Sequence, residues 1–296
     1  MTHDADVLII GGGVTGCGIL RDLALRGIRA ILIDRGDLNS GASGGNHGLL
    51  HSGGRYATAD TETAAECRIE GDILKRMAPQ AIDDCGGLFV AVEGDDPGFA
   101  ERFGARCAAA GIDCAPLAVE EARRLEPAIS ERAVAAYTVP DATVDPFRLT
   151  IEQVADAHRL ADAAFLPHTE LIGFDIDGGR IRAAHCRDTR SGEARTIRAK
   201  QYLNAAGAWS MAVARLAGCD DVRVLWSKGT LVIANVRLTR RVVNRLRPPG
   251  DGDILVPGGT VSILGTTSDT IPSLDTVRPT VAEVDRNIEE GTALIP

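Results

Sequence analysis

The sequence predicts an α/β protein in which a doubly wound, dinucleotide-binding domain with a β-meander is combined with an α+β domain whose sheet is largely antiparallel. Two observations lead to this class. A glycine-rich turn joins an apolar strand to a helix near the N-terminus, and short strands follow one another without intervening helices in the later part of the chain.

The first strand is expected at residues 7–10, a continuous apolar run of the kind that is buried in parallel sheets. It leads into the spacing G-x-G-x-x-G, formed by Gly11, Gly13 and Gly16, and into a helix that ends at Arg26-Gly27. In a dinucleotide-binding turn, the first glycine permits the tight turn and the second lets the backbone approach a pyrophosphate, while the third allows close packing of helix and strand. The positive end of the helix dipole then faces the anion.

A second strand is expected at residues 30–33, and it ends in Asp34, which lies 34 − 11 = 23 residues after Gly11. A carboxylate at this distance can accept hydrogen bonds from the hydroxyl groups of an adenosine ribose. Because strand, helix and acid all fall where the binding mechanism needs them, we interpret the segment as a nucleotide site and not as an ordinary glycine turn.

The remaining elements follow from periodicity and from turn residues. A polar, glycine-rich loop is expected at 37–56, and helices at 62–77, from Pro146 to about 163, and at 281–294. Strands are expected at 88–92, 135–139, 170–176, 181–188, 195–200, 201–207, 222–225, 230–236, 254–256 and 261–264. We expect residues 1–85 and 141–218 to form the nucleotide-binding domain, and residues 86–140 and 219–296 to form the second domain.

Composition narrows the function classes. The chain has 296 residues, of which 45% are hydrophobic and 25% charged, as in globular proteins large enough for two domains. The net charge of −9 argues against a nucleic-acid partner. No apolar run approaches the roughly 18 residues of a transmembrane segment, and the N-terminus does not resemble a signal peptide, so we expect a cytoplasmic protein. The seven cysteines lack metal-ligand spacing, so no metal site is expected.

Four motifs and the glycine turn carry a resemblance to a known family. The motifs are NHGLLHSGGRY (46–56), VDPFRL (144–149), NAAGAW (204–209) and ILVPGGTVSILGTT (254–267). With residues 11–27 they resemble the FAD-dependent glycerol-3-phosphate dehydrogenases of the D-amino-acid-oxidase-like flavoprotein superfamily, and among these the catalytic subunits of the anaerobic enzymes. Since that family continues well past the position of Pro296, we expect the chain to be an N-terminal fragment.

The resemblance implies FAD as cofactor and sn-glycerol 3-phosphate as substrate. It also implies electron-transfer and membrane-anchor subunits as partners, which would make the protein peripheral on the inner face of the cell membrane and pass electrons to a quinone. The residues expected to contact FAD lie in the glycine turn, at the end of the second strand, in the following loop and in two later strands. They are Gly11, Gly13, Val14, Thr15, Gly16, Asp34, Arg35, Ser40, Ala42, Ser43, Asn46, His47, Gly48, Leu49, Leu171, Ala206, Gly207 and Trp209.

Four residues are expected to act on the substrate. Oxidation of a secondary alcohol requires a base for the hydroxyl proton, and His51, in the loop implied to face the flavin, is the candidate. Arg55 presents a planar fork of donors that suits a phosphate dianion, and Tyr56 can add a hydroxyl contact. Lys228 resembles a position near the flavin or substrate.

Two alternatives stay open from the sequence. A 2-hydroxy-acid dehydrogenase of the L-2-hydroxyglutarate type shares the outline of the loop before His51, although the pair Arg55-Tyr56 favours a phosphate ester. A non-catalytic, cofactor-binding fragment is the other alternative.

Overall fold

The computed structural model describes residues 2–275 and 277–296, which form two compact units. The first unit joins the chain up to Asn46 with Pro146–Trp226, and the second joins His47–Asp145 with the chain from Ser227 onward. Parallel and antiparallel sheets are combined with helices in these units, which confirms the predicted fold class.

The limits of the units differ from the predicted domain boundaries at residues 47–85 and 141–145. The reason is a small sheet in the second unit, in which β8 (Ala142–Val144) pairs with both β3 (Leu49–Leu50) and β4 (Ile82–Asp83). Residues 219–226 also fall outside their predicted domain, and the Trp226 indole donates a hydrogen bond of 2.9 Å to the carbonyl of Ala208 in the first unit.

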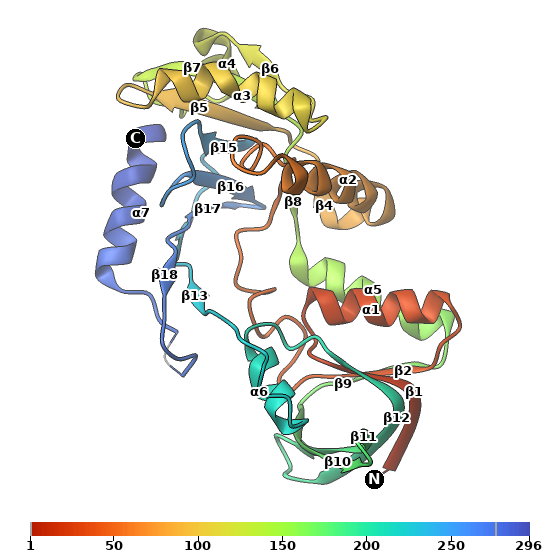
Figure 1. The fold of residues 1–296 in the computed structure, drawn as a ribbon. Helices are drawn as coiled ribbons and strands as arrows, with labels where there is room; N and C mark the ends of the chain where they lie inside the picture. Colours follow the sequence, from red (N-terminus) through yellow and green to blue (C-terminus); the bar gives the residue numbers. More distant parts are fainter. Residues whose placement is uncertain (1, 276) are drawn as a thin grey trace. The chain divides into compact units, whose positions relative to one another are not determined.

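The first unit is built on a six-stranded sheet, visible around the N-terminus in Figure 1. Its strands, in spatial order, are β10 (Thr169–Asp177), β11 (Arg180–Asp188), β12 (Ala194–Asn204), β1 (Thr2–Ile10), β2 (Ala30–Ile33) and β9 (Ala163–Leu166). The strands from β12 to β9 run parallel, and β10, β11 and β12 form the predicted antiparallel meander.

Two details of this sheet differ from the prediction. The strands expected at 195–200 and 201–207 are one continuous strand, β12, because β1 pairs with it from Thr196 to Asn204. The helix expected to reach residue 163 ends at Leu160, since the apolar residues of β9 pair with β2 instead.

Two helices cover one face of the parallel strands, and mainly the antiparallel meander covers the other. Figure 1 shows α1 (Val14–Leu25) and α5 (Pro146–Leu160) side by side on one face, where Leu20 and Ala157 join a buried cluster with Ile9 and Leu32. On the other face, Leu8 and Ile33 pack with the meander and with α6 (Ser210–Leu216). The strand predicted at residues 7–10 is therefore buried on both faces, as expected for a parallel sheet.

The second unit contains a seven-stranded sheet. Its strands, in spatial order, are β14 (Leu231–Ala234), β17 (Val261–Gly265), β16 (Ile254–Gly258), β15 (Val242–Arg245), β5 (Gly87–Val92), β7 (Ala133–Val139) and β6 (Ala115–Leu117). Only the pair β15 and β5 is parallel among the described pairs of this sheet. The sheet is thus largely antiparallel, as predicted. Two short strands, β13 (Ser227–Lys228) and β18 (Asp269–Thr270), pair separately.

Strand β15 was not expected, because its sequence VVNR combines two apolar residues with Asn244 and Arg245, both of which are buried. In contrast, no strand forms at residues 222–225, where Leu225 is 82% exposed and therefore contributes nothing to the core.

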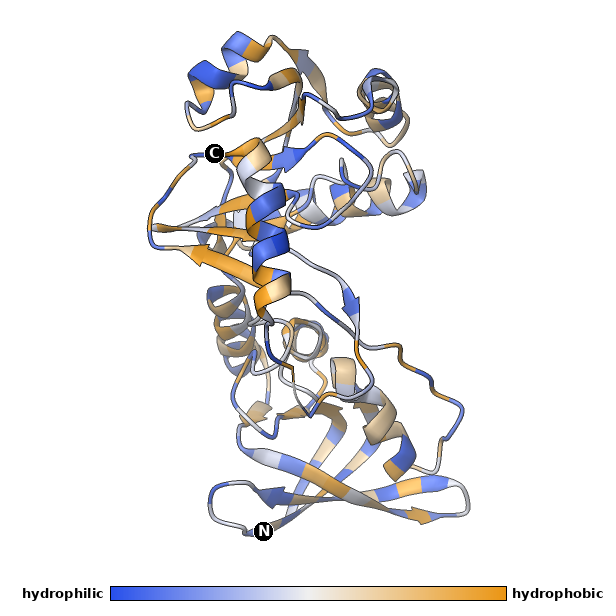
Figure 2. Cartoon of the chain, turned by 90° about the vertical axis from the view of Figure 1, so that its left-hand side faces the viewer, coloured by the Kyte–Doolittle hydropathy of each residue, from blue (hydrophilic) through white to orange (hydrophobic). Residues whose placement is uncertain are grey.

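The helices of the second unit are α2 (Thr61–Met77), the short η1 (Pro79–Ala81), α3 (Pro97–Ala109), α4 (Val119–Leu125) and α7 (Val281–Leu294). Figure 2 shows that α7, which ends beside the marked C-terminus, is mainly hydrophilic in its middle turns and more hydrophobic toward its ends. Thr280 and Glu283 form a capping box at its start. None of the helices among residues 2–275 and 277–296 is long and apolar enough to cross a bilayer.

The turn before α1 generates a test of the packing. A Cβ at Gly16 would collide with the carbonyl oxygen of Gly11, whereas a Cβ at Gly18 would meet only the Gln153 side chain, at 3.8 Å. We expect Gly16→Ala to lower the free energy of unfolding by about 1–3 kcal/mol, the usual cost of overpacking. The matched change Gly18→Ala should be neutral or raise it by about 0.5–1 kcal/mol, since alanine favours helix. Guanidinium denaturation followed by circular dichroism measures both, and equal stability of the two variants would contradict this steric explanation.

Candidate functional site

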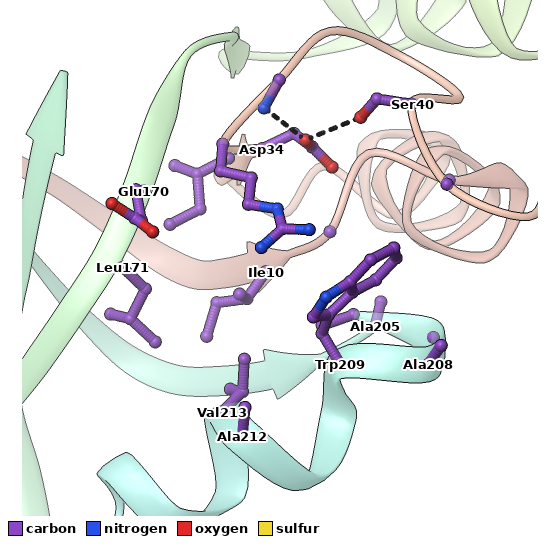
Figure 3. Close-up of a pocket in the computed structure, with 18 of the residues that line it drawn as sticks. Ile10, Asp34, Ser40, Glu170, Leu171, Ala205, Ala208, Trp209, Ala212 and Val213 are labelled. Atoms are coloured by element: carbon purple, nitrogen blue, oxygen red, sulfur yellow. Dashed lines mark hydrogen bonds between the residues drawn. The ribbon is translucent and has the colours of Figure 1, made fainter. Parts of the chain in front are cut away.

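A cavity of about 540 Å³ opens in the first unit at the carboxyl ends of β1 and β2. Its walls are the turn after β1, the end of β2 with the loop 35–43, the start of β10, and η2 (Gly207–Trp209) with α6. Figure 3 shows side chains from these separate segments converging on one space. The carboxyl edge of parallel strands is where ligands bind in doubly wound folds.

The glycine turn brings backbone close to backbone. Gly11 has a φ of 116°, and a Cβ there would collide with the carbonyl oxygen of Ala205 at the end of β12. A Cβ at Gly13 would lie 2.9 Å from the Ser43 hydroxyl oxygen. Each of Gly11, Gly13 and Gly16 is thus required by a different close neighbour. Together they leave the start of α1 open to the cavity.

The start of α1 suits an anion. The N-cap residue of α1 is Gly13, which has no side chain to cap the helix, and the first turn contains no acidic residue that would repel an anion. The amide of Val14 donates to the Ser43 hydroxyl at 3.0 Å. The backbone amides of a first helical turn lack partners within the helix. Because Gly13 and Thr15 line the cavity, the amides at this end of α1 can donate hydrogen bonds to a phosphate group there.

Asp34 lies at the edge of the cavity and is held by donors from the protein. One carboxylate oxygen accepts the Gly12 amide at 2.7 Å. The other accepts the Gly36 amide at 2.7 Å and the Ser40 hydroxyl at 3.2 Å, and Figure 3 shows Ser40 donating to Asp34. Each carboxylate oxygen has two lone-pair sites, so Asp34 retains acceptor capacity toward a ribose.

The guanidinium group of Arg35, just after β2, lies over the indole ring of Trp209 in η2. The guanidinium carbon of Arg35 lies 4.4 Å from the centroid of the Trp209 ring, within the range of a cation–π interaction, and both residues line the cavity.

Most of the predicted cofactor residues meet at this cavity. Those that line it are Gly11, Gly13, Thr15, Asp34, Arg35, Ser40, Ala42, Ser43, Leu171, Ala206, Gly207 and Trp209. Val14, Gly16 and Asn46 belong to the same unit without lining the cavity, and His47, Gly48 and Leu49 belong to the second unit.

Sequence reasoning missed several residues of the cavity wall. Glu170 precedes Leu171 on β10, and its position next to a predicted contact was a usable signal. Ala212, Val213 and Leu216 come from α6, and nothing in their spacing indicated that this helix faces the nucleotide turn.

The cavity fits the adenosine and diphosphate part of a dinucleotide such as FAD. Its wall combines apolar surfaces, among them Ile10 and Leu171, with a carboxylate for a ribose and with the open helix start for phosphates. The predicted cofactor residues that line the cavity are those that would hold this part of the cofactor.

In the second unit, the loop 47–56 brings three ring side chains together. The ring centroid of His51 lies 5.9 Å from that of His47 and 5.6 Å from that of Tyr56. His47 accepts the Leu49 amide on its Nδ1 at 3.1 Å, so its neutral ring carries its hydrogen on Nε2. Gly48 has a φ of 72°, which lets the chain turn between the two histidines.

Both imidazoles are neutral at physiological pH. Burial, reinforced by the positive charge of Arg55, lowers the pKa of His51 from 6.5 to about 4. Burial, with smaller effects of His51 and Arg55, likewise lowers the pKa of His47 to about 4. Burial raises the pKa of the Tyr56 phenol, which therefore stays protonated. A neutral imidazole can accept a proton, and a protonated phenol can donate a hydrogen bond.

Arg55 is fixed at its far end by a buried carboxylate. Its Nη2 donates to the carbonyl of Gly250 at 3.2 Å, and its Nη1 lies 3.6 Å from Asp253. The side chain of Asp253 is 0% exposed and is shared with Arg247, while the side chain of Arg55 is 15% exposed. Since a guanidinium has five N–H donors, Arg55 keeps donors for an anion.

Lys228 has a structural role in this unit. Its ammonium group lies 2.8 Å from Glu283, donates to the carbonyl of Arg278 at 2.5 Å, and is only 11% exposed. The hydrogen bond from Lys228 is the main reason why the pKa of Glu283 falls to about 2. Among residues 2–275 and 277–296, no group of three or more His, Cys, Asp or Glu side chains could hold a metal ion.

Comparison with known proteins places this geometry in a family. The sequence model of the DAO family, described as FAD dependent oxidoreductase, matches residues 6–296. One of the subunits of the anaerobic glycerol-3-phosphate dehydrogenase of Escherichia coli (strain K12) is 43% identical over 297 residues, covering 100% of this chain and 54% of the relative. The chain thus spans about half the length of the curated relatives it matches.

Solved structures share the fold at lower identity. L-proline dehydrogenase from P. horikoshii superposes with a TM-score of 0.84 at 21% identity, covering 100% of this chain and 78% of that one. L-alpha-glycerophosphate oxidase from Mycoplasma pneumoniae, solved with FAD bound, gives 0.83 at 21% identity and covers 99% and 79%. The match of the family model over almost the whole chain confirms the predicted FAD-dependent oxidoreductase, and the chain therefore belongs to the DAO family of FAD dependent oxidoreductases.

Proposed function

We propose that this chain oxidises sn-glycerol 3-phosphate to dihydroxyacetone phosphate, with electrons passed to a quinone through partner subunits. The observation that carries the proposal is the loop 47–56, which holds the neutral imidazole of His51, the partly exposed guanidinium of Arg55 and the phenol of Tyr56. The rings of His51 and Tyr56 lie 5.6 Å apart. The relatives that are named as subunits of anaerobic glycerol-3-phosphate dehydrogenase support the same substrate and the presence of partners, and such partners would hold the protein at the inner face of the membrane.

In this proposal the first unit binds FAD and the second unit binds the substrate. FAD, when bound, supplies the acceptor for the hydride that leaves the alcohol carbon. His51 takes the hydroxyl proton, and Arg55 with Tyr56 binds the phosphate group. Asn46, His47, Gly48 and Leu49, which lead into this loop, stay proposed cofactor contacts, as do Val14 and Gly16 beside the cavity. For Lys228 we keep the proposal of a place near the substrate, although its ammonium group already has protein partners.

Arg55 and His51 are electrostatically coupled, which relates substrate binding to proton transfer. The positive charge of Arg55 contributes to the low pKa of His51. A phosphate dianion on Arg55 offsets this charge, so the bound substrate raises the pKa of His51 toward the range in which a general base is most effective. An uncharged end of a substrate would lack this effect.

The cofactor cavity can be tested through Asp34. We expect the purified protein to be yellow, with flavin absorbance near ~450 nm, and Asp34→Ala to weaken FAD binding about tenfold or more, because a hydrogen bond to a charged group contributes about 1.5–3 kcal/mol. Quenching of flavin fluorescence measures the affinity. Asp37→Ala is the matched control, since Asp37 is exposed and does not line the cavity. A colourless protein, or equal affinities in the two variants, would contradict the assignment of this cavity to FAD.

The phosphate site can be tested through Arg55. In the complete gene product with its partner subunits, Arg55→Ala should raise the apparent KM for sn-glycerol 3-phosphate by about 10- to 100-fold, the loss expected for a charge-assisted hydrogen bond. Steady-state kinetics with a quinone analogue measure this value. Arg247→Lys serves as control, because Arg247 shares Asp253 with Arg55 but is not proposed to bind substrate. An unchanged KM would refute the assignment of Arg55 to the phosphate site. Reduction of the flavin by a 2-hydroxy acid, and not by sn-glycerol 3-phosphate, would refute the proposed substrate.

The proposed base can be tested by rapid-mixing measurements of flavin reduction. His51→Ala should slow the reduction by about 10²- to 10⁴-fold, the usual contribution of a general base, while the dissociation constant of the substrate changes little. His185→Ala is a matched control, since His185 pairs with Asp175 on the meander of the first unit. Equal rates in the His51 variant and the parent protein would mean that another group takes the proton.

A further inference from the structure

A buried carboxylate lies beneath the loop that carries His51. Asp141 is 2% exposed and precedes β8 in the second unit. One oxygen of its carboxylate accepts the amide of Ser52 at 2.8 Å, and the other accepts the side-chain amide of Asn244 at 2.9 Å. Ser52 directly follows His51, so Asp141 holds the backbone at the residue next to the proposed base.

The carboxylate is costly at this position. Burial raises the pKa of Asp141, and the hydrogen bonds from Ser52 and Asn244 act against this rise. Lys75 is the cation that acts on it, but its ammonium group donates to Asp84 at 2.6 Å and to the carbonyl of Pro140 at 3.0 Å. A buried carboxyl group without a direct ion pair destabilises a protein unless hydrogen bonds compensate.

The surrounding strands are adapted to Asp141. A Cβ at Gly87, the first residue of β5, would lie 2.7 Å from the side chain of Asp141, so glycine leaves the space that the carboxyl group occupies. Asn244 is 0% exposed on β15, and its side-chain oxygen has no hydrogen-bond partner among the described residues. Its amide group donates to Asp141 and, at 3.4 Å, to the carbonyl of Leu88. Strands β5 and β15 are thus both adapted to the carboxylate of Asp141, β5 by a glycine that leaves space and β15 by a buried asparagine that donates a hydrogen bond.

We propose that Asp141 is a positioning residue for His51: its carboxylate, oriented by Asn244, fixes the backbone amide of Ser52 and thereby the place of the imidazole. The role of His51 in this statement rests on the proposed function. Arg55 is held independently, by Gly250 and Asp253. Loss of the Asp141 contact therefore displaces the imidazole and leaves the phosphate-binding side chain in place.

The test uses Asp141→Asn, in which the new amide group cannot accept from both Ser52 and Asn244. The first readout is NMR titration of the six histidines, with the signal of His51 identified from His51→Gln. In the parent protein the midpoint of His51 is expected at about 4. In Asp141→Asn we expect it to move up by at least about one pH unit, toward the ordinary histidine value, because the imidazole becomes more hydrated.

The second readout is kinetic and uses the complete gene product with its partners. Asp141→Asn should slow flavin reduction by about 10- to 100-fold, as expected for a misplaced catalytic group, with less than about a twofold change in the dissociation constant of sn-glycerol 3-phosphate. The double change Asp141→Asn with Asn244→Asp restores one donor facing one acceptor, and it should recover part of both effects. If Asp141→Asn does not fold, Asn244→Ala, which removes one donor to the carboxylate, should produce a smaller shift in the same direction.

Glu126→Gln is the matched control for the loss of a buried carboxylate. Glu126 is 1% exposed and accepts the amides of Arg240 and Arg241, in a part of the second unit that does not contain the loop 47–56. It should lower stability and leave the His51 titration unchanged. The proposal is overturned if the Asp141 variants leave the titration unchanged or if Glu126→Gln shifts it equally. The expected titration shift, combined with full activity of His51→Ala, would refute the proposed function and leave the positioning contact intact.

Discussion

The close approach of three backbone segments at the turn after β1 is the constraint on which the first unit depends. The carbonyl of Gly11 lies where a side chain at position 16 would begin, and the carbonyl of Ala205 lies where one at position 11 would begin. The start of α1 and the end of β12 can therefore meet the turn only if glycine occupies both positions. This approach leaves a space at the carboxyl edge of the sheet, and the neighbouring segments line it with Asp34, Arg35 and Trp209.

The second unit is organised around buried polar groups. Asp141, Asp253 and Glu126 are almost completely buried, and each accepts hydrogen bonds from backbone amides of a loop or turn. Hydrophobic clusters hold the sheets and helices of this unit together, but apolar contacts have no direction. Hydrogen bonds to a fixed carboxylate do have direction, and they give the loop 47–56 a defined conformation. Burying Asp141 and Asp253 is energetically unfavourable, but their hydrogen bond and ion pair fix the positions of His51 and Arg55.

Much of the fold could be predicted because its signals are local. The turn 11–16, the helix 62–77 and the helix 281–294 were predicted almost to the residue, since glycine spacing and apolar periodicity identify them. Strand β1 ends at Ile10 as predicted but begins at Thr2, five residues before the predicted start, because residues 2–5 also pair with β12. Strand β15 was missed because half of its residues, Asn244 and Arg245, are polar, and their burial depends on partners more than 100 residues away, Asp141 and Asp95. The strand expected at 222–225 does not form because its apolar residues meet no core.

The sequence by itself determined the nucleotide-binding turn, the strands and helix that flank it and the residue types available for chemistry, because glycine spacing, strand burial and side-chain chemistry act over a few residues. Tertiary structure alone decided that residues 47–85 belong with the second unit, that Lys228 pairs with Glu283, and that Asp141 and Asp253 hold the loop of His51 and Arg55. The physical reason is that charge pairing and burial act between segments that are distant along the chain. The partner of a charged side chain is settled only when the folded chain brings the two groups together.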